Sequence, residues 1–205
     1  MANQIIVVGN FIGSSCYSFK LHNLRNIVKQ YNFHLHPFDS SHEDRIVITG
    51  NIIRQNDLLH LSYLVEGNLS EIAIPNLSTT PQRQRQLWEN TCFEFFLGIK
   101  NTSQYWEFNL SPSGDWNIYR FSKYRSPIQE ETAFNSLPYK LEKNARNLRL
   151  NLQLNLQPII ASSQDLQVGI TTVIRSKNNG LSYWALIHPG EEADFHRQDS
   201  FILNL

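Results

Sequence analysis

The feature that most constrains the fold is a strict alternation of leucine with polar residues. It runs through NLRLNLQLNLQ, residues 147–157. Successive side chains of a β-strand point to opposite faces, so the leucines share one face and Asn, Arg and Gln share the other. An α-helix would scatter the leucines around its surface. The run therefore predicts a strand with one buried and one hydrated face, as in one sheet of an antiparallel sandwich.

Similar patterns of alternating or clustered apolar residues recur along most of the chain. They predict strands at residues 46–53, 58–67, 91–97, 105–110, 116–121, 166–174 and 182–187, and a short one within 200–205. Turn residues separate several of these segments, at 55–57, 111–115 and 176–180. Many short strands with turn-rich links and little helix predict an all-β fold, an antiparallel β-sandwich of the jelly-roll or immunoglobulin-like kind.

The other segments carry weaker patterns. We expect residues 1–32 to be an N-terminal extension or an edge of the domain, and residues 21–31 show partial helical spacing. Residues 68–86 predict a long polar loop, a type of segment that often carries binding groups. Residues 122–146 predict irregular chain. We find no linker, low-complexity run or repeat, so we expect one domain spanning residues 1–205.

Charge and cysteine content exclude several classes of partner. The 18 basic and 18 acidic residues balance, which argues against a nucleic-acid partner or an anionic membrane surface. No apolar run approaches the roughly 20 residues of a membrane-spanning helix. The N-terminus lacks the basic region of a secretory signal, so we expect a cytoplasmic protein. Cys16 and Cys92 are expected to be separate reduced thiols. The sequence gives no indication of an oligomeric state.

The recognised catalytic motifs do not occur in this chain. G-x-S-x-G, H-E-x-x-H, a P-loop and G-x-G-x-x-G are all missing, and we predict no catalytic residues and no enzymatic activity. Aromatic residues make up 12% of the chain and interleave with polar groups. Sugars present apolar C–H faces and hydroxyl groups, so their sites combine a flat aromatic face with carboxylate, amide and guanidinium groups. The pattern favours a carbohydrate-type ligand, although tryptophans in β-sandwiches usually fill the core.

Trp88, Glu94 and Arg85 form the clearest candidate group for such a ligand. Trp88 offers a flat face, and Arg85 can donate to hydroxyls in a forked geometry. Glu94 lies within a predicted strand and shares a face with Cys92 and Phe96. A carboxylate on a largely apolar strand must pair with an arginine or face a ligand cleft, because burying it alone is costly. Both alternatives stay open.

Further candidates lie on the next two predicted strands and the segment that follows. Asn109 belongs to the polar face of residues 105–110, which is either a hydrated sheet face or the floor of a groove. Trp116 is a candidate aromatic platform. Arg120 and Arg125 are candidate donors to ligand oxygens, with a solvated surface as the alternative for both.

The C-terminal segment YWALIHPGEEADFHRQD brings together Trp184, His188 and His196. Two histidines and a nearby acid suggest a metal ion, but the eight-residue spacing across a loop matches no known ligand signature, and we predict no metal site. Haem is the alternative cofactor, because histidine can ligate it axially. Met1 is the only methionine, so bis-histidine ligation would remain.

Three segments carry a resemblance to a known family: RQLWENTCFEFFLG, YWEFNLSPSGDWNIYRFSKYR and SYWALIHPGEEADFHRQDSF. Together they resemble the DOMON-like family, related to the family-nine carbohydrate-binding modules, from roughly Phe33 to the C-terminus. The resemblance implies a jelly-roll or immunoglobulin-like sandwich with a pocket for sugar or haem. Trp88 and Glu94 match the W-x5-E spacing of the sugar-binding relatives. The resemblance therefore implies that Trp88 stacks on a sugar and that Glu94 contacts the hydroxyl groups of that sugar. Trp184 is the candidate second platform, with Trp116 in reserve.

Three hypotheses about function follow. The first is a non-catalytic module that binds a carbohydrate, a glycan or another sugar-like small molecule by stacking and polar contacts. The second is a haem- or metal-binding domain that uses His188 and His196, which belong to the motif of this branch and not to that of the sugar-binding modules. The third is an interaction domain without a small ligand, whose tryptophans all lie in the core.

Overall fold

The computed structural model describes residues 28–40, 46–178 and 180–205. These residues form strands and short 3-10 turns, with no α-helix among them. Accordingly, no helix in this part of the chain is long and apolar enough to cross a membrane. The strands are β1 (Val28–Pro37), β2 (Ile46–Gln55), β3 (Leu58–Gly67), β4 (Cys92–Ile99), β5 (Tyr105–Leu110), β6 (Trp116–Phe121), β7 (Gln129–Glu130), β8 (Tyr139–Lys143), β9 (Asn147–Asn155), β10 (Leu166–Ser176), β11 (Gly180–Ala185) and β12 (Leu203–Asn204).

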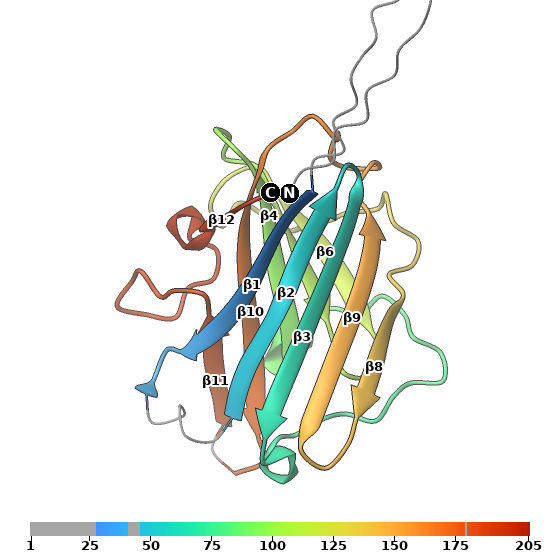
Figure 1. Ribbon diagram of the computed structural model, residues 1–205, viewed down its shortest axis with the longest axis vertical. Coiled ribbons are helices and arrows are strands. Elements are labelled where there is room, and N and C mark those ends of the chain that lie inside the picture. The colour runs from blue at the N-terminus through green and yellow to red at the C-terminus, as the bar shows by residue number, and fades with distance from the viewer. Residues whose placement is uncertain (1–27, 41–45, 179) are drawn as a thin grey trace, which may run out of the picture.

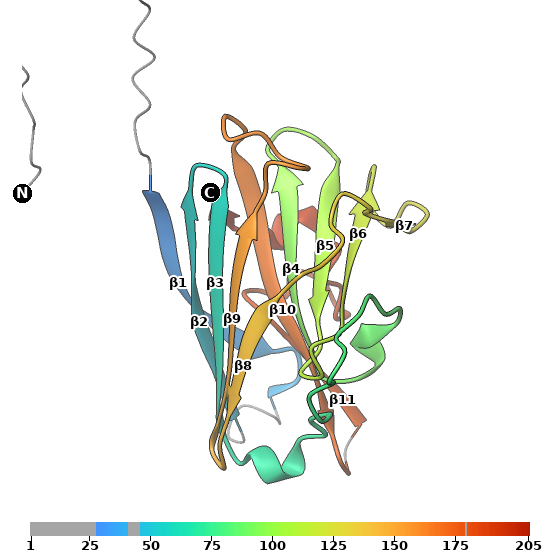
Figure 2. The same ribbon diagram turned by 90° about the vertical axis from the view of Figure 1, so that its right-hand side faces the viewer.

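The strands form two facing layers, visible edge-on in Figure 2 and face-on in Figure 1. The first sheet has the order β1-β2-β3-β9-β8, and the second has the order β7-β6-β5-β4-β10-β11, with β12 beside β10. β1 joins the layers, because it pairs with β2 over most of its length while His36 and Pro37 pair with β11. All strand pairs are antiparallel. The predicted antiparallel all-β sandwich is confirmed, and its finer jelly-roll or immunoglobulin-like assignment stays a prediction.

Most strand predictions agree with the structure, and β3, β5 and β6 begin and end at the predicted residues. Two weaker predictions do not agree. The helical alternative for the end of segment 21–31 is wrong for residues 28–31, which begin β1. The irregular segment 122–146 contains β7 and β8, which extend the edges of the two sheets. Their alternation covers few residues, so the sequence signal is short. The first 27 residues, Cys16 among them, lie outside the described residues.

The interior lies between the two sheets, and the first sheet fills its side of it by alternation. The leucines of residues 147–157 are all buried, as predicted. So are Leu59, Leu61, Tyr63 and Val65 of β3, the face predicted from the sequence. The opposite residues of β3 and β9 are partly or fully exposed, so the outer face of the first sheet is hydrated.

The central strands of the second sheet, β4 and β5, are buried on both of their faces. In β4, Phe93 and Phe95 point into the interior, where Phe95 stacks on Phe108 with ring centroids 4.3 Å apart. On the outer face a separate group of buried rings, here called the outer cluster, consists of Phe96, Tyr105, Tyr119, Phe121 and Phe201. Trp88 and Phe195 pack against the outer cluster from the covering segments. The outer cluster is therefore a second, smaller core on the face of the second sheet that points away from the first sheet.

One hydrogen bond from the interior fixes the strand that carries the main candidate residue. The hydroxyl of Tyr63, from the first sheet, donates to the backbone carbonyl of Glu94 in the second sheet at 2.6 Å. The ring of Tyr63 lies 5.0 Å from that of Phe93 and 5.5 Å from that of Phe33. The sandwich core thus supports Glu94 from beneath while its side chain points to the outer face.

Candidate functional site

A cavity of about 430 Å³ lies on the outer face of the second sheet. Strands, the 3-10 turn η3 (Leu87–Glu89) and two covering loops contribute its lining. The lining residues are Trp88, Glu89, Glu94, Phe96, Glu107, Arg125, Ile128, Val173, Leu181, Tyr183, Ala193, Phe195 and His196. Its size falls within the range that is typical of pockets for small ligands.

Trp88 reaches the cavity from η3, directly before β4. Gln86, at the start of this turn, adopts a left-handed backbone conformation with φ of +59°. The backbone N–H groups of Glu89 and Asn90 then donate to the carbonyls of Gln86 and Leu87. The Trp88 ring meets that of Tyr119 edge to face, with centroids 5.7 Å apart. The side chain is only partly buried, so part of its indole is open to a ligand.

Glu94 lies on the floor of the cavity and is almost completely buried, with 2% of its surface exposed. The Thr171 hydroxyl donates to its Oε2 over a long 3.5 Å. Its Oε1 is the one buried side-chain nitrogen or oxygen of the described residues without a hydrogen-bond partner. Burial, followed by the charge of nearby Glu107, raises the pKa of Glu94 well above its ordinary value. A buried acceptor of this kind calls for a donor from outside the protein.

Glu107, on the neighbouring strand β5, is the second acid of the cavity floor and is 5% exposed. Asn109 donates from Nδ2 to its Oε1 at 2.9 Å. Its Oε2 lies 3.9 Å from Nε2 of His196, too far for a hydrogen bond. Burial raises the pKa of Glu107 to about 7. The cavity floor therefore holds two carboxyl groups, and each has one oxygen without a donor at hydrogen-bonding distance among the described residues.

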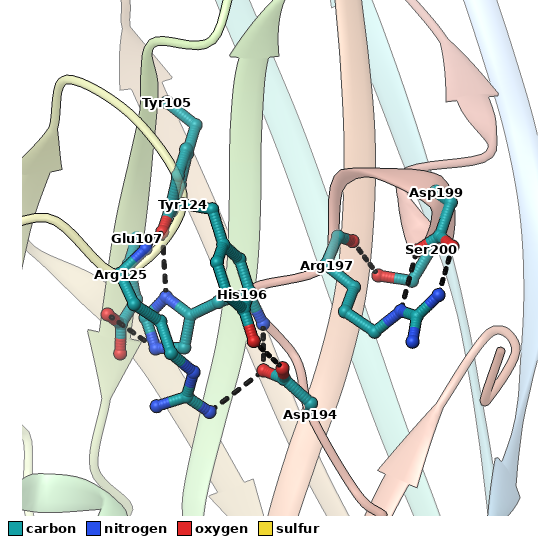
Figure 3. Close-up of polar contacts among 9 residues, drawn as sticks. All are labelled: Tyr105, Glu107, Tyr124, Arg125, Asp194, His196, Arg197, Asp199 and Ser200. Atoms are coloured by element: carbon teal, nitrogen blue, oxygen red, sulfur yellow. Dashed lines mark hydrogen bonds and ion pairs between the residues drawn. The ribbon is translucent and has the colours of Figure 1, made fainter. Parts of the chain in front are cut away.

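A hydrogen-bonded network holds the covering loops in place, as Figure 3 shows. Asp194 accepts hydrogen bonds from the Tyr124 hydroxyl and, at 2.8 Å, from the Arg125 guanidinium. It also accepts from the backbone N–H of His196 at 3.0 Å. Burial alone would raise the pKa of Asp194, but these bonds hold it below its ordinary value. The network joins the loop after β6 to the loop after β11 across the cavity.

The same network sets the tautomer of His196. The Tyr105 hydroxyl accepts from the backbone N–H of Arg125 at 3.2 Å and lies 3.0 Å from Nδ1 of His196. The hydroxyl has a single proton, which is best donated to Nδ1, and the ring proton then lies on Nε2, facing Glu107. Burial lowers the pKa of His196 to about 4, so this imidazole is neutral at neutral pH.

The structure brings together some of the residues predicted from the sequence. Trp88, Glu94, Arg125 and His196 all line the cavity. Asn109 lies beneath them, where it donates to Glu107.

The other predicted residues lie elsewhere. Trp116 and Trp184 belong to the interior core, with 4% and 2% of their surfaces exposed, and neither lines the cavity. Their inward position gives no support for a stacking role, because a sugar could reach neither indole. Arg85 pairs with Glu130 at 2.8 Å on the surface. Arg120 donates to Gln129 at 3.1 Å on an exposed edge. His188 lies 2.9 Å from the carbonyl of His36 and does not line the cavity.

Several lining residues were absent from the predicted set, among them Glu107, Tyr183 and Phe195. Tyr183 precedes Trp184 in β11, so the two side chains point to opposite faces. The sequence therefore shows that the two side chains lie on opposite faces of the strand. It does not show which of these faces packs into the core. Phe195 comes from a loop, where no periodicity marks orientation.

Two alternative sites were also considered. A cavity of about 540 Å³ lies on the hydrated outer face of the first sheet, where His60, Arg149 and Asn151 are among its lining residues. No tryptophan lines it, and neither does the unpartnered Glu94. The described residues contain no group of three or more His, Cys, Asp or Glu side chains placed to hold a metal ion.

Comparison with known proteins relates the chain to solved structures alone. No protein-family model and no curated protein matches it. A protein from Bacteroides uniformis to which carbohydrate binding is ascribed superposes with a TM-score of 0.59 and 12% identity, over 83% of this chain and 84% of that one. At this identity the likeness concerns the fold.

A second solved structure is a family 9 carbohydrate-binding module from Caldicellulosiruptor kristjanssonii in complex with glucose. It aligns over 94% of this chain and 90% of that one, with 11% identity and a TM-score of 0.42. A TM-score of this size supports no further conclusion. Membership of the DOMON-like family therefore stays a prediction.

Proposed function

We propose that this chain is a non-catalytic β-sandwich that binds a small carbohydrate in the cavity on the outer face of the second sheet. The observation that carries the proposal is the pairing of Trp88 with Glu94. A partly exposed indole lies at a cavity whose floor holds a buried carboxyl oxygen without a partner. A sugar satisfies both groups at once, because its C–H face stacks on the ring and a hydroxyl donates to Oε1.

The rest of the cavity supports the same class of ligand. Tyr183 lines it with 37% of its surface exposed and offers a second aromatic surface in the role predicted for Trp184. The Arg125 guanidinium, held by Asp194, is a further donor for ligand oxygens. The likeness in fold to a protein to which carbohydrate binding is ascribed agrees with the proposal.

A thermal-stability panel of neutral and charged mono- and disaccharides tests this function. A ligand at a hundred times its dissociation constant adds about 2.7 kcal/mol of stability, which appears as a shift of several degrees. We expect at least one sugar to produce a shift with the wild-type protein and none with Trp88→Ala. Trp184→Phe, which keeps a buried ring in the core, is the matched control and should retain the shift. A panel without any shift, or a shift that survives in Trp88→Ala, would contradict the proposal.

A further inference from the structure

The cavity contains more acidic groups than basic ones. Glu89, Glu94 and Glu107 line it, and Arg125 is the one arginine or lysine among the described lining residues. The Arg125 guanidinium already bonds to Asp194 at 2.8 Å, so the protein itself offsets that positive charge. A ligand entering the cavity therefore meets no uncompensated positive charge from the lining residues that would attract uronic acids, sugar phosphates or other anionic sugars.

The two buried acids lack the partners that an ionised carboxyl group needs. Oε1 of Glu94 has no hydrogen-bond partner, and the carboxyl group has weak donors alone, the Thr171 hydroxyl at 3.5 Å from Oε2 and the Cys92 thiol. In Glu107, Asn109 satisfies Oε1, while Oε2 has His196 at 3.9 Å. A neutral hydroxyl can supply a single donor to such a site. An ammonium group supplies three N–H donors together with the opposite charge, which stabilises the ionised carboxyl groups.

Aromatic side chains complete the surroundings of these acids. Trp88, Phe96, Tyr183 and Phe195 all line the cavity. The faces of aromatic rings attract cations, by about 0.5–2 kcal/mol depending on how far the cation is desolvated. Rings and carboxylates in one partly enclosed site are the environment in which proteins bind ammonium groups.

We propose that the ligand is an amino sugar with a free, protonated amine, whose ammonium group lies between Glu94 and Glu107 while its ring stacks on Trp88. This inference rests on the proposed carbohydrate-binding function and specifies its ligand class. The ammonium group occupies the unpartnered side of Glu94, and the sugar ring fills the aromatic part of the cavity. N-acetylation removes the charge and enlarges the group, so acetylated sugars bind more weakly.

Calorimetric titration with matched sets of sugars tests this specificity. Each set contains a hexose, its 2-amino-2-deoxy derivative and the N-acetylated form, in the gluco, galacto and manno series. The titrations are run at about pH 6.5, where an amine of ordinary pKa stays protonated. In at least one series we expect the free amine to bind about tenfold or more tightly than its two neutral partners, since an ionic and cation–π contact of about 1.4 kcal/mol corresponds to tenfold.

Variants separate this inference from the function on which it rests. Glu94→Gln keeps the shape of the side chain and should bring the ratio of amine to hexose affinity close to one, and Glu142→Gln, an exposed acid on β8, should leave the ratio unchanged. Equal binding of amine and hexose in every series would overturn the amino-sugar inference and leave carbohydrate binding intact. Failure of every sugar to bind would overturn both. If Glu94→Gln does not fold, the ratio of amine to hexose affinity in the wild-type protein decides whether the amino-sugar inference holds.

Discussion

Replacing single tryptophans with alanine separates a ligand platform from a core residue. Trp184 lies in the interior with 2% of its surface exposed, and its indole N–H donates to the Ser182 hydroxyl at 3.0 Å. Trp88 lies on the outer face, where it is partly exposed and contacts Tyr119 edge to face. The two residues are chemically identical, so a difference between their alanine variants reports on their surroundings.

The expected magnitudes follow from these surroundings. Truncating a fully buried tryptophan costs about 3–5 kcal/mol, so Trp184→Ala should lose this much free energy of unfolding. Trp88→Ala forfeits one ring contact of about 0.5–1.5 kcal/mol and part of its apolar burial, which together amount to about 1–2 kcal/mol. In a chain of this size each kcal/mol lowers the melting temperature by about 2–4 °C.

Urea denaturation followed by circular dichroism measures both free energies. We expect Trp184→Ala to be the less stable variant by about 2 kcal/mol or more. Trp88→Ala should retain the wild-type far-ultraviolet spectrum while it loses sugar binding. A Trp88→Ala variant as unstable as Trp184→Ala would refute the reasoning, because Trp88 would then be part of the fold and not a platform.

Further predictions concern pH and packing. Burial raises the pKa of Glu107 to about 7, so the stability it contributes is present at low pH and is lost as the pH rises from about 4.5 to 7. Burial lowers the pKa of His196 from 6.5 to about 4, so its contribution is present above 6.5 and is lost as the pH falls to about 4. Urea titrations of Glu107→Gln should therefore show stability that rises more steeply with pH than in the wild type, and an unchanged slope would count against the buried acid. A Cβ at Gly50 would meet the Ser62 carbonyl and the Phe33 ring, so Gly50→Ala should cost about 1–3 kcal/mol or more, and an unaltered melting temperature would contradict this packing of β1, β2 and β3.

The fold could be predicted from the sequence where one sheet face meets water. In β9 the leucines alternate with polar residues, so the pattern identifies both the strand and its buried face. β4 is buried on both faces, and its sequence CFEFFLGI shows no alternation of polarity that distinguishes the interior from the outer cluster. The strand was therefore predictable, whereas the second core on its outer side was not.

The candidate site was predictable where a residue conflicted with its local surroundings. Glu94 stood out as an acid within an apolar strand, and the structure places it on a cavity floor. Trp184 and Tyr183 are adjacent aromatic residues on opposite faces, so alternation alone could not decide which faces the ligand. Phe195 and His196 reach the cavity through loop contacts between residues far apart in sequence, and local patterns carry no information about these contacts.

A crystal structure of the protein with a bound sugar, chosen from the matched sets by affinity, tests the central claim most directly. The account predicts ring carbons within about 4 Å of the Trp88 indole face and a ligand N–H or O–H donor within about 3.2 Å of Glu94 Oε1. A sugar bound instead in the cavity on the first sheet, beside Arg149, with the Trp88 face unoccupied, would contradict it.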